Sequence, residues 1–281
     1  MSAGGETAAA TPPRVEVVIV AHNAGELLGD AVRSAAEQAG AANVWVMDAE
    51  SSDGSVQREA SQAQGVHFVA VPNRGFSASN NRGIEATRSP FVLLLNPDAR
   101  LEPGALEALL ASAEAHLKAG AIGPAILNPD GSAQANSFGR FPTLATTIAL
   151  RFQRLAENLS GNSTHSPRLP AATTPVDWVT GAAMLVRRSA IEDAGKMDER
   201  FFLYYEDTEW CHRMRDHAWE VLLEPAARVT HHLGGSGAPQ GRAAAAYRDS
   251  FYRYCDLYGL WGLKAFASVG LSVRKVFGGA G

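Results

Sequence analysis

The chain has 281 residues, of which 46% are hydrophobic and 19% charged, as in a globular protein with one sizeable domain or two small ones. Its 25 lysine and arginine residues against 29 aspartate and glutamate residues give a net charge of -4, which argues against a generally basic protein that coats nucleic acid. Two cysteines, Cys211 and Cys255, are too few for a disulfide scaffold or a four-cysteine zinc site, and they fit a reducing compartment.

Neither end of the chain has a pattern typical of targeting or membrane insertion. Residues 1–13 are small and polar, lack the basic and apolar regions of a signal peptide, and predict a disordered tail. The most apolar late stretch, Leu260–Val276, is broken by glycines and basic residues before it reaches the length of a membrane span. We interpret it as a packed terminal helix, with a helix resting on a membrane surface as the alternative. We therefore expect a cytoplasmic protein and leave peripheral contact with the inner face of the plasma membrane open.

Short apolar runs alternate with helical periodicity in the first part of the chain. The expected strands are Val15–Val20, Val44–Met47, Val66–Val71 and Phe91–Leu95. The expected helices cover residues 27–39, 56–64, 77–88 and about 103–117, the third of them capped by Ser77. This β-α order predicts a parallel sheet with helices on both faces.

Each expected strand ends in a polar loop. These loops are Ala21-His22-Asn23, Asp48–Ser55, Asn73–Gly75 and Asn96-Pro97-Asp98. Ligands bind at the carboxyl ends of parallel strands, so four polar ends predict one shared site. Neither a GxGxxG nor a GxxxxGK[ST] pattern follows a strand, which argues against a dinucleotide-binding Rossmann site and a P-loop.

The middle of the chain has a weaker pattern. Asn128-Pro129-Asp130-Gly131 predicts a turn, and residues 156–175 predict a mobile loop or lid. Ordered structure is expected again at Val176–Val179 and from Gly181 to Val186.

Asp98 is a candidate metal ligand. It follows an apolar strand directly, and a carboxylate there, with water and phosphate oxygens, suits Mg²⁺ or Mn²⁺. An ordinary Asn-Pro-Asp turn is the alternative.

Glu206 and Asp207 are candidate catalytic acids. A helix is expected to start at these residues, where its dipole would keep carboxylates ionised and suited to act as a general base. Simple capping of the helix by acidic residues is the alternative.

His231 and His232 end a short expected strand, Ala227–Thr230, before a glycine turn. Adjacent strand residues point to opposite faces, so at most one of the two is expected to bind a metal.

Several segments together resemble family 2 glycosyltransferases. Asp48–Ser55 (DAESSDGS) resembles the family's D-N-x-S-x-D-G-[ST] segment, and Asn73–Ile84 (NRGFSASNNRGI) resembles N-x-G-[FY]-x-x-x-x-N-x-G-[IV]. Leu95–Asp98 stands where the family has its D-x-D-like metal motif. Trp178–Arg187 with Gly195–Phe202, Glu206, Asp207 and Arg213 resembles the G-A-x-[ML]…D-E-x-F-F…E-D segment. The match runs in order from about Val15 to Ser236 and is most similar to the bacterial rhamnosyltransferase branch.

This resemblance implies a GT-A fold of the α/β class and an inverting, metal-dependent transfer from a nucleotide-diphosphate sugar. It implies that Asp207, with Glu206 beside it, is the base, and that Asp98 and His231 hold Mg²⁺ or Mn²⁺; His231 has the family's H-x-x-G-x-S spacing to Gly234 and Ser236. The residues expected to bind the nucleotide sugar are Ala21, Asn23, Asp48, Asn81, Asn96, Asp98 and Gly181.

Three positions depart from the family pattern. Ala49 replaces an asparagine, so a hydrogen bond near the nucleotide is expected to be missing. Asn96 replaces the first aspartate of D-x-D, which leaves Asp98 as the sole carboxylate there, and Glu209 stands where aspartate is common. None removes the expected base or main metal ligand, so we expect an active enzyme.

The predicted organisation is a tail (1–13), a GT-A domain (14–236) and a helical C-terminal extension (237–281). The extension begins with several aromatic residues and carries scattered basic ones; we expect most of the aromatics to pack against the core, with closure over the acceptor or contact with anionic lipid as alternatives. The expected donor is a dTDP- or UDP-sugar, the sugar rhamnose or a similar hexose, and the acceptor a glycan or polyprenyl-linked hydroxyl in cell-envelope polysaccharide synthesis. The alternatives are a sugar nucleotidyltransferase and a non-catalytic carbohydrate-binding relative.

Overall fold

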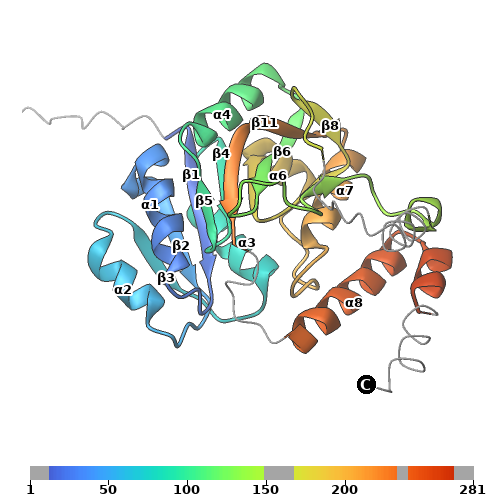
Figure 1. Ribbon diagram of the computed structural model, residues 1–281, viewed down its shortest axis with the longest axis horizontal. Helices are drawn as coiled ribbons and strands as arrows, with labels where there is room; N and C mark the ends of the chain where they lie inside the picture. Colours follow the sequence, from blue (N-terminus) through green and yellow to red (C-terminus); the bar gives the residue numbers. More distant parts are fainter. Residues whose placement is uncertain (1–12, 149–167, 233–239, 269–281) are drawn as a thin grey trace, which may run out of the picture.

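A central mixed sheet with helices on both faces forms the body of the protein (Figure 1). The computed structural model describes residues 13–148, 168–232 and 240–268. The strand order in the sheet is β3-β2-β1-β4-β10-β6-β11-β5, with β8 paired to β11 off this path. Most of the predicted tail, the first part of the predicted lid, Gly234, Ser236 and the end of the Leu260–Val276 segment lie outside the described residues.

The first half of the sheet is parallel, as the sequence predicts. It contains β1 (Val15–Ala21), β2 (Val44–Asp48), β3 (His67–Ala70) and β4 (Phe91–Leu95), with β1 hydrogen-bonded to both β2 and β4. Every residue of β1 is buried, because helices cover both faces of this strand. The connecting helices are α1 (Leu27–Ala39), α2 (Ser55–Gln62) and α3 (Phe76–Ala86); η1 (Ala41–Asn43) precedes β2.

The second half of the sheet is largely antiparallel. β10 (Ala183–Arg187) lies antiparallel between β4 and β6 (Ala119–Leu127), and β11 (Glu220–His231) runs parallel to β6. β5 (Ala99–Leu101) and β8 (Thr174–Val176) pair antiparallel with β11. The short strand expected at Ala227–Thr230 is therefore the end of the longer strand β11. The sequence does not predict the full strand, because the pairing register with β6 shifts between Glu224 and Arg228.

Two hydrophobic cores lie on opposite faces of the sheet. One contains Ile19 of β1 with Leu28 of α1 and Leu109 of α4 (Ala105–Ala115). The other contains Val18 of β1 with Ile84 of α3, and it extends to α6 (Arg188–Ala194) and α7 (Glu206–Asp216). A two-stranded sheet of β7 (Phe138–Gly139) and β9 (Trp178–Val179) lies next to α7. This layering leaves the loops at the strand ends at one edge.

The start of α3 differs from the prediction that Ser77 caps it. The helix begins at Phe76, and Gly75 occupies the N-cap position with a φ of 103°. A Cβ atom at Gly75 would lie 2.5 Å from the carbonyl oxygen of Phe202, so only glycine fits this approach. The Ser77 hydroxyl instead donates to the carbonyl of Phe201 at 2.8 Å, which ties α3 to the loop before α7.

The C-terminal extension contains α8 (Gln240–Leu257), which lies across the molecule from α1 and α2 in Figure 1. Tyr254 and Cys255 are buried, so part of this helix packs on the domain as expected, while Tyr247 stays exposed. Over the described ranges, no helix has the length and apolar character to cross a membrane.

Candidate active site

The ends of β1 and β2 place the expected nucleotide-side residues together. Ala21 and Asp48 are register partners, and the amide of Ala49 donates to the Ala21 carbonyl at 2.8 Å. The Asp48 carboxylate accepts from the Ser51 amide at 2.9 Å. Asn23, with a φ of 51°, accepts from the Ser52 amide at 2.8 Å. These contacts hold the two loops at fixed positions beside each other.

A buried carboxylate–imidazole pair lies at the end of β4. The Oδ1 atom of Asp98 is 3.1 Å from the Nε2 atom of His231, although the residues belong to distant parts of the chain. His231 ends β11, whose last residue pairs with the start of β5, directly after Asp98. Of the adjacent histidines, His231 is thus the one whose ring faces Asp98; His232 contributes its amide to the Asp98 carbonyl at 2.9 Å.

The tautomer of His231 follows from its neighbour Gln134. The Gln134 amide nitrogen donates to Asn128 and to the His231 carbonyl, so its Oε1 atom faces the ring Nδ1 at 2.8 Å. Nδ1 must therefore carry a proton, which leaves the lone pair of a neutral ring on Nε2. That lone pair and the Asp98 carboxylate repel each other unless a cation or a proton lies between them. No sequence pattern pointed to Gln134, because it stands in a stretch without periodicity.

The pair is suited to a divalent cation completed by other oxygens. Across the residues that the structure describes, no group of three or more His, Cys, Asp or Glu side chains forms a complete metal site. The Oδ1 atom of Asn96, however, is buried and has no hydrogen-bond partner in the described part of the chain, and the Nδ2 atom of Asn96 lies 3.2 Å from His231 Nε2. Mg²⁺ commonly takes one or two protein carboxylates and fills its shell with water and phosphate oxygens. The donor set here fits such an ion.

The start of α7 holds the two candidate catalytic acids in different environments. Asp207 accepts hydrogen bonds from the amide of Gly181 at 3.0 Å and from the amide of Thr208 at 2.6 Å. Glu206 is buried, and among the residues that the structure describes its Oε2 atom has no hydrogen-bond partner. Asp207 is thus a fixed, partly exposed carboxylate, whereas Glu206 faces the interior.

Burial controls the acidity of both groups. It raises the pKa of Glu206 well above its ordinary value, and the neighbouring Asp207 charge adds to this effect. Burial also raises the pKa of Asp207, although hydrogen bonds from Gly181 and Thr208 oppose the rise. The expectation that the helix dipole keeps both carboxylates ionised is therefore wrong for Glu206, because desolvation outweighs a partial charge at the helix end.

Asp207 and the Asp98–His231 pair lie along one edge of the sheet. Gly181, whose amide binds Asp207, precedes Ala182, whose carbonyl accepts from the Asn96 amide at 2.9 Å. A Cβ atom at Gly181 would lie 3.1 Å from the ring of Phe76, so the start of α3 also packs close to Gly181. The end of β4 and the start of β10 therefore lie side by side and connect the proposed base to the proposed metal ligands.

Other motif residues hold elements together. The Asn81 amide group donates to Met197 and Glu199 and accepts from the Met197 amide, so these hydrogen bonds join α3 to the loop before α7. Arg213 forms two hydrogen bonds to Glu209, at 2.7 and 2.9 Å, one turn earlier on α7. The sequence pattern could not separate these positions from those that face the site.

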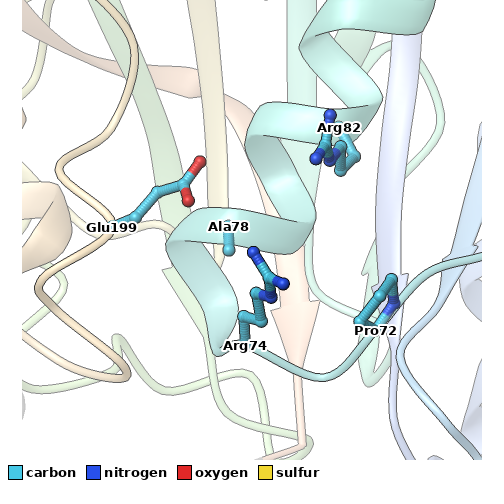
Figure 2. A pocket seen from close by; sticks show the side chains of 5 residues that line it. All are labelled: Pro72, Arg74, Ala78, Arg82 and Glu199. Carbon is cyan, nitrogen blue, oxygen red and sulfur yellow. The ribbon is translucent and has the colours of Figure 1, made fainter.

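A small cavity lies outside this edge, beside α3. It measures about 80 Å³ and is lined by Pro72, Arg74, Ala78, Arg82 and Glu199. Figure 2 shows the Arg74 guanidinium beside Ala78 at the start of α3, with Arg82 farther along the helix. None of the residues expected to bind the donor lines this cavity.

Comparison with known proteins identifies the family. The sequence model for "Glycosyl transferase family 2" matches residues 16–194, more than half of the chain. The chain belongs to glycosyl transferase family 2. This glycosyltransferase is 30% identical over 235 residues to the N-acetylglucosaminyl-diphospho-decaprenol L-rhamnosyltransferase of Mycobacterium tuberculosis H37Rv, covering 78% of this chain and 76% of that protein. It is 25% identical to rhamnosyltransferase WbbL of Escherichia coli K12, covering 60% of this chain and 64% of that protein.

Solved structures confirm the GT-A fold of this glycosyltransferase. A crystal structure of GalNAc-T7 with UDP, GalNAc and Mn²⁺ matches 88% of the chain with a TM-score of 0.62 and 15% identity. The chain spans about half the length of that protein, 48%. A crystal structure of S. aureus TarS residues 1–349 matches 79% of this chain and 61% of that one, with a TM-score of 0.53 and 13% identity.

Proposed function

We propose that this glycosyltransferase moves a hexose, rhamnose or a close analogue, from a nucleoside diphosphate donor to a hydroxyl of a polyprenyl-linked or glycan acceptor in cell-envelope polysaccharide synthesis. The names of the relatives from M. tuberculosis and E. coli support rhamnose and a lipid-linked acceptor. The observation that supports the proposal is the path of hydrogen bonds from Asp207 to Gly181, and from the adjacent Ala182 to Asn96, which stands two residues before Asp98.

The donor would lie along the ends of β1, β2 and β4. Asp48 would hydrogen-bond the base of the nucleotide, with Ala21 and Asn23 alongside it. Asn96 and Gly181 border the position where the sugar would sit. Asn81 would support the ribose and diphosphate indirectly, because its amide already binds Met197 and Glu199. The proposed donor is a dTDP- or UDP-sugar.

Asp98 and His231 would hold Mg²⁺ or Mn²⁺ at the diphosphate. The ion, when bound, would stabilise the negative charge that develops on the leaving nucleoside diphosphate. Gln134 would keep His231 in the tautomer whose Nε2 lone pair faces Asp98. The buried Oδ1 atom of Asn96 would gain a partner from the ion or from its water.

Asp207 would remove the proton from the acceptor hydroxyl. Its two oxygens are held by the Gly181 and Thr208 amides, and a pKa raised by burial makes this carboxylate a better proton acceptor near neutral pH. The activated oxygen would attack the anomeric carbon opposite the diphosphate in a single displacement, so the anomeric configuration inverts. Glu206 would stay protonated beside it and leave the charge on Asp207.

A two-step assay tests the proposal. Nucleotide sugars, including dTDP-rhamnose, UDP-glucose and GDP-mannose, are screened by thermal shift with and without Mn²⁺. A donor at one hundred times its Kd stabilises the fold by about 2.7 kcal/mol. The best donor is then incubated with N-acetylglucosaminyl diphosphate on a short prenyl chain, and NMR reports the anomeric configuration of the product. Absence of stabilisation by every nucleotide sugar, or retention at the anomeric carbon, would contradict the proposal.

A further inference from the structure

Three aromatic side chains are exposed near the start of α7. The exposed fractions of Phe202, Tyr204 and Tyr247 are 54%, 37% and 51%. The rings of Tyr204 and Tyr247 meet edge to face with their centroids 5.7 Å apart, although one comes from a loop and the other from α8. Exposed apolar groups that gather from separate segments mark binding surfaces, whereas single ones are common everywhere. We call Tyr204 and Tyr247, together with Phe202 two residues before Tyr204 on the same loop, the aromatic platform.

The platform is held in place by α8. The Ser250 hydroxyl donates to the Leu203 carbonyl at 2.8 Å, which fixes the loop to the helix. The hydroxyl of Tyr205 lies 3.3 Å from that of Tyr247, and its ring is 5.4 Å from that of the buried Tyr254. The C-terminal extension therefore determines how the exposed rings are presented.

The loop that carries the platform has a strained backbone. Tyr204 and Tyr205 have φ values of 68° and 64°, in the left-handed region that bulky residues rarely adopt. Such strain persists where surrounding contacts enforce it, and it is concentrated at functional sites. Here the two residues stand directly before Glu206, the first residue of α7. The same turn that exposes Tyr204 thus also sets the start of the helix that carries Asp207.

A short chain of contacts joins the platform to Asp207. The carbonyl of Phe202 accepts from the Phe76 amide at 2.8 Å. The Phe76 ring borders Gly181, whose amide binds the Asp207 carboxylate at 3.0 Å. The platform and the proposed base therefore lie in one neighbourhood, formed by the starts of α3 and α7.

We propose that the aromatic platform binds the sugar ring of the acceptor and so brings its hydroxyl to Asp207. This inference rests on the proposed glycosyl transfer. Most residues proposed for the donor lie at the ends of β1, β2 and β4, and none lies on α8, to which Tyr247 belongs. We therefore assign the platform to the other substrate. A sugar ring presents C–H groups on its face and hydroxyls at its rim, which match the electron-rich face and the hydroxyl of tyrosine.

Charge near the platform favours a sugar over an anionic bilayer. Arg248, next to Tyr247 on α8, is paired with Asp249 at 2.9 Å. The positive charge that would attract anionic lipid is therefore offset locally. A neutral, hydroxyl-rich ring has no such requirement.

The test separates acceptor binding from donor binding. Tyr204→Ala and Tyr247→Ala are assayed with dTDP-rhamnose and N-acetylglucosaminyl diphosphate on a short prenyl chain. We expect each variant to raise the acceptor KM about tenfold, because it loses roughly one aromatic contact and the hydrophobic area that this contact covers. The donor KM should change less than about twofold. Tyr247→Phe keeps the ring but removes the hydroxyl, so it should raise the acceptor KM less than Tyr247→Ala does. Trp261→Ala, which removes a ring that is 73% exposed farther along the extension, is the matched control and should leave both KM values unchanged.

Three results would overturn the inference. The first is an unchanged acceptor KM in both alanine variants. A lower kcat with an unchanged acceptor KM counts here too, because it would show only that the residues position α7. The second is a loss of binding to phosphatidylglycerol vesicles by Tyr247→Ala with no change in acceptor KM, which would make the bilayer the partner. The third is wild-type enzyme that binds donor but neither binds nor glycosylates this probe; that failure appears before any variant is made and contradicts the proposed acceptor together with the platform's role.

Discussion

The imidazole Nε2 atom of His231 and the carboxylate of Asp98 face each other at 3.1 Å in a buried position. In the neutral ring this Nε2 atom carries no proton, because Gln134 holds the proton on Nδ1. Two electron-rich groups at this distance repel each other unless a cation or a proton lies between them. The two side chains are therefore positioned to bind a positively charged group between them. The pairing of β5 with β11 holds them there, because it aligns His231 at the end of β11 with Ala99, the residue after Asp98.

Removing this pair should uncouple nucleotide binding from metal. We expect Asp98→Ala to lower the affinity for dTDP or UDP at least about tenfold in Mn²⁺, and to leave the weaker metal-free affinity unchanged, because only the bridged complex uses the carboxylate. Isothermal titration calorimetry with Mn²⁺ and with EDTA measures both. Equal affinities for wild type and variant in Mn²⁺ would exclude Asp98 as a ligand.

Gln134 provides a milder variant of the same experiment. Gln134→Leu removes the acceptor that holds the proton on Nδ1 of His231, and changes in such supporting groups typically cost about 10–100-fold in metal affinity. Gln62→Leu at the exposed end of α2 makes the same chemical change away from the site and should have no effect.

Asp207 should be required for transfer and dispensable for donor binding. Asp207→Asn keeps the shape of the side chain and its contact with the Gly181 amide but removes the proton acceptor, so kcat should fall by about 10²–10⁴-fold. The donor Kd should stay within about threefold, since the donor is expected to lie on the ends of β1, β2 and β4. Asp216→Asn at the exposed end of α7 is the control. Wild-type turnover by Asp207→Asn would show that another group is the base.

The sequence predicted the parallel half of the fold well because its signals are local. A buried parallel strand such as β1 is apolar throughout, and the helices between such strands carry one apolar face. The antiparallel insertion of β10 between β4 and β6 was not predictable, because strand order depends on pairing across the sheet rather than on periodicity. The start of α3 was missed because the close approach of Gly75 to Phe202 depends on tertiary structure.

The candidate site was predictable in its charged groups and not in their surroundings. Asp98, Asp207 and His231 stand at recognisable spacings, whereas Gln134 reaches His231 only through the folded chain. Likewise, the first turn of a helix indicates ionised acids, but the burial of Glu206 reverses that expectation. Desolvation depends on which side of α7 faces the core, and that is settled by packing.

Glu206 should make stability depend on pH. Folding raises the pKa of Glu206, so the folded state binds the proton more tightly than the unfolded state does. The contribution of this proton to the free energy of unfolding is complete below the unfolded pKa, about 4.3. It is lost as the pH rises from there toward the folded pKa. Glu206→Gln mimics the neutral acid at every pH. We expect thermal unfolding to show equal midpoints for the two proteins at pH 4 and a variant midpoint higher by roughly 3 °C or more at pH 8.5.

The control for this experiment is Glu26→Gln, an exposed acid at the start of α1. Glu26 is the N-cap residue of its helix, one position before the place that Glu206 has on α7, and its side chain is exposed. The midpoint of Glu26→Gln should therefore follow that of wild type across the pH range. A Glu206→Gln variant that is less stable than wild type at pH 8.5 would mean that the carboxylate is ionised and held by contacts other than those described.

Gly83 should be required for the contact between α3 and β1. A Cβ atom there would lie 2.2 Å from Cγ1 of Val18, a buried side chain of β1 that cannot move away. We expect Gly83→Ala to lower the free energy of unfolding by about 1–3 kcal/mol, as overpacking usually does, despite the better helix propensity of alanine. Adding Val18→Ala should recover part of the loss, so that the double variant is more stable than the sum of the single changes predicts. Gly29→Ala in α1, where the neighbour is the end of the flexible Glu59 side chain, should be neutral or stabilising. Urea denaturation of the four proteins and wild type provides these values, and strictly additive effects of Gly83→Ala and Val18→Ala would show that the two residues do not compete for the same space.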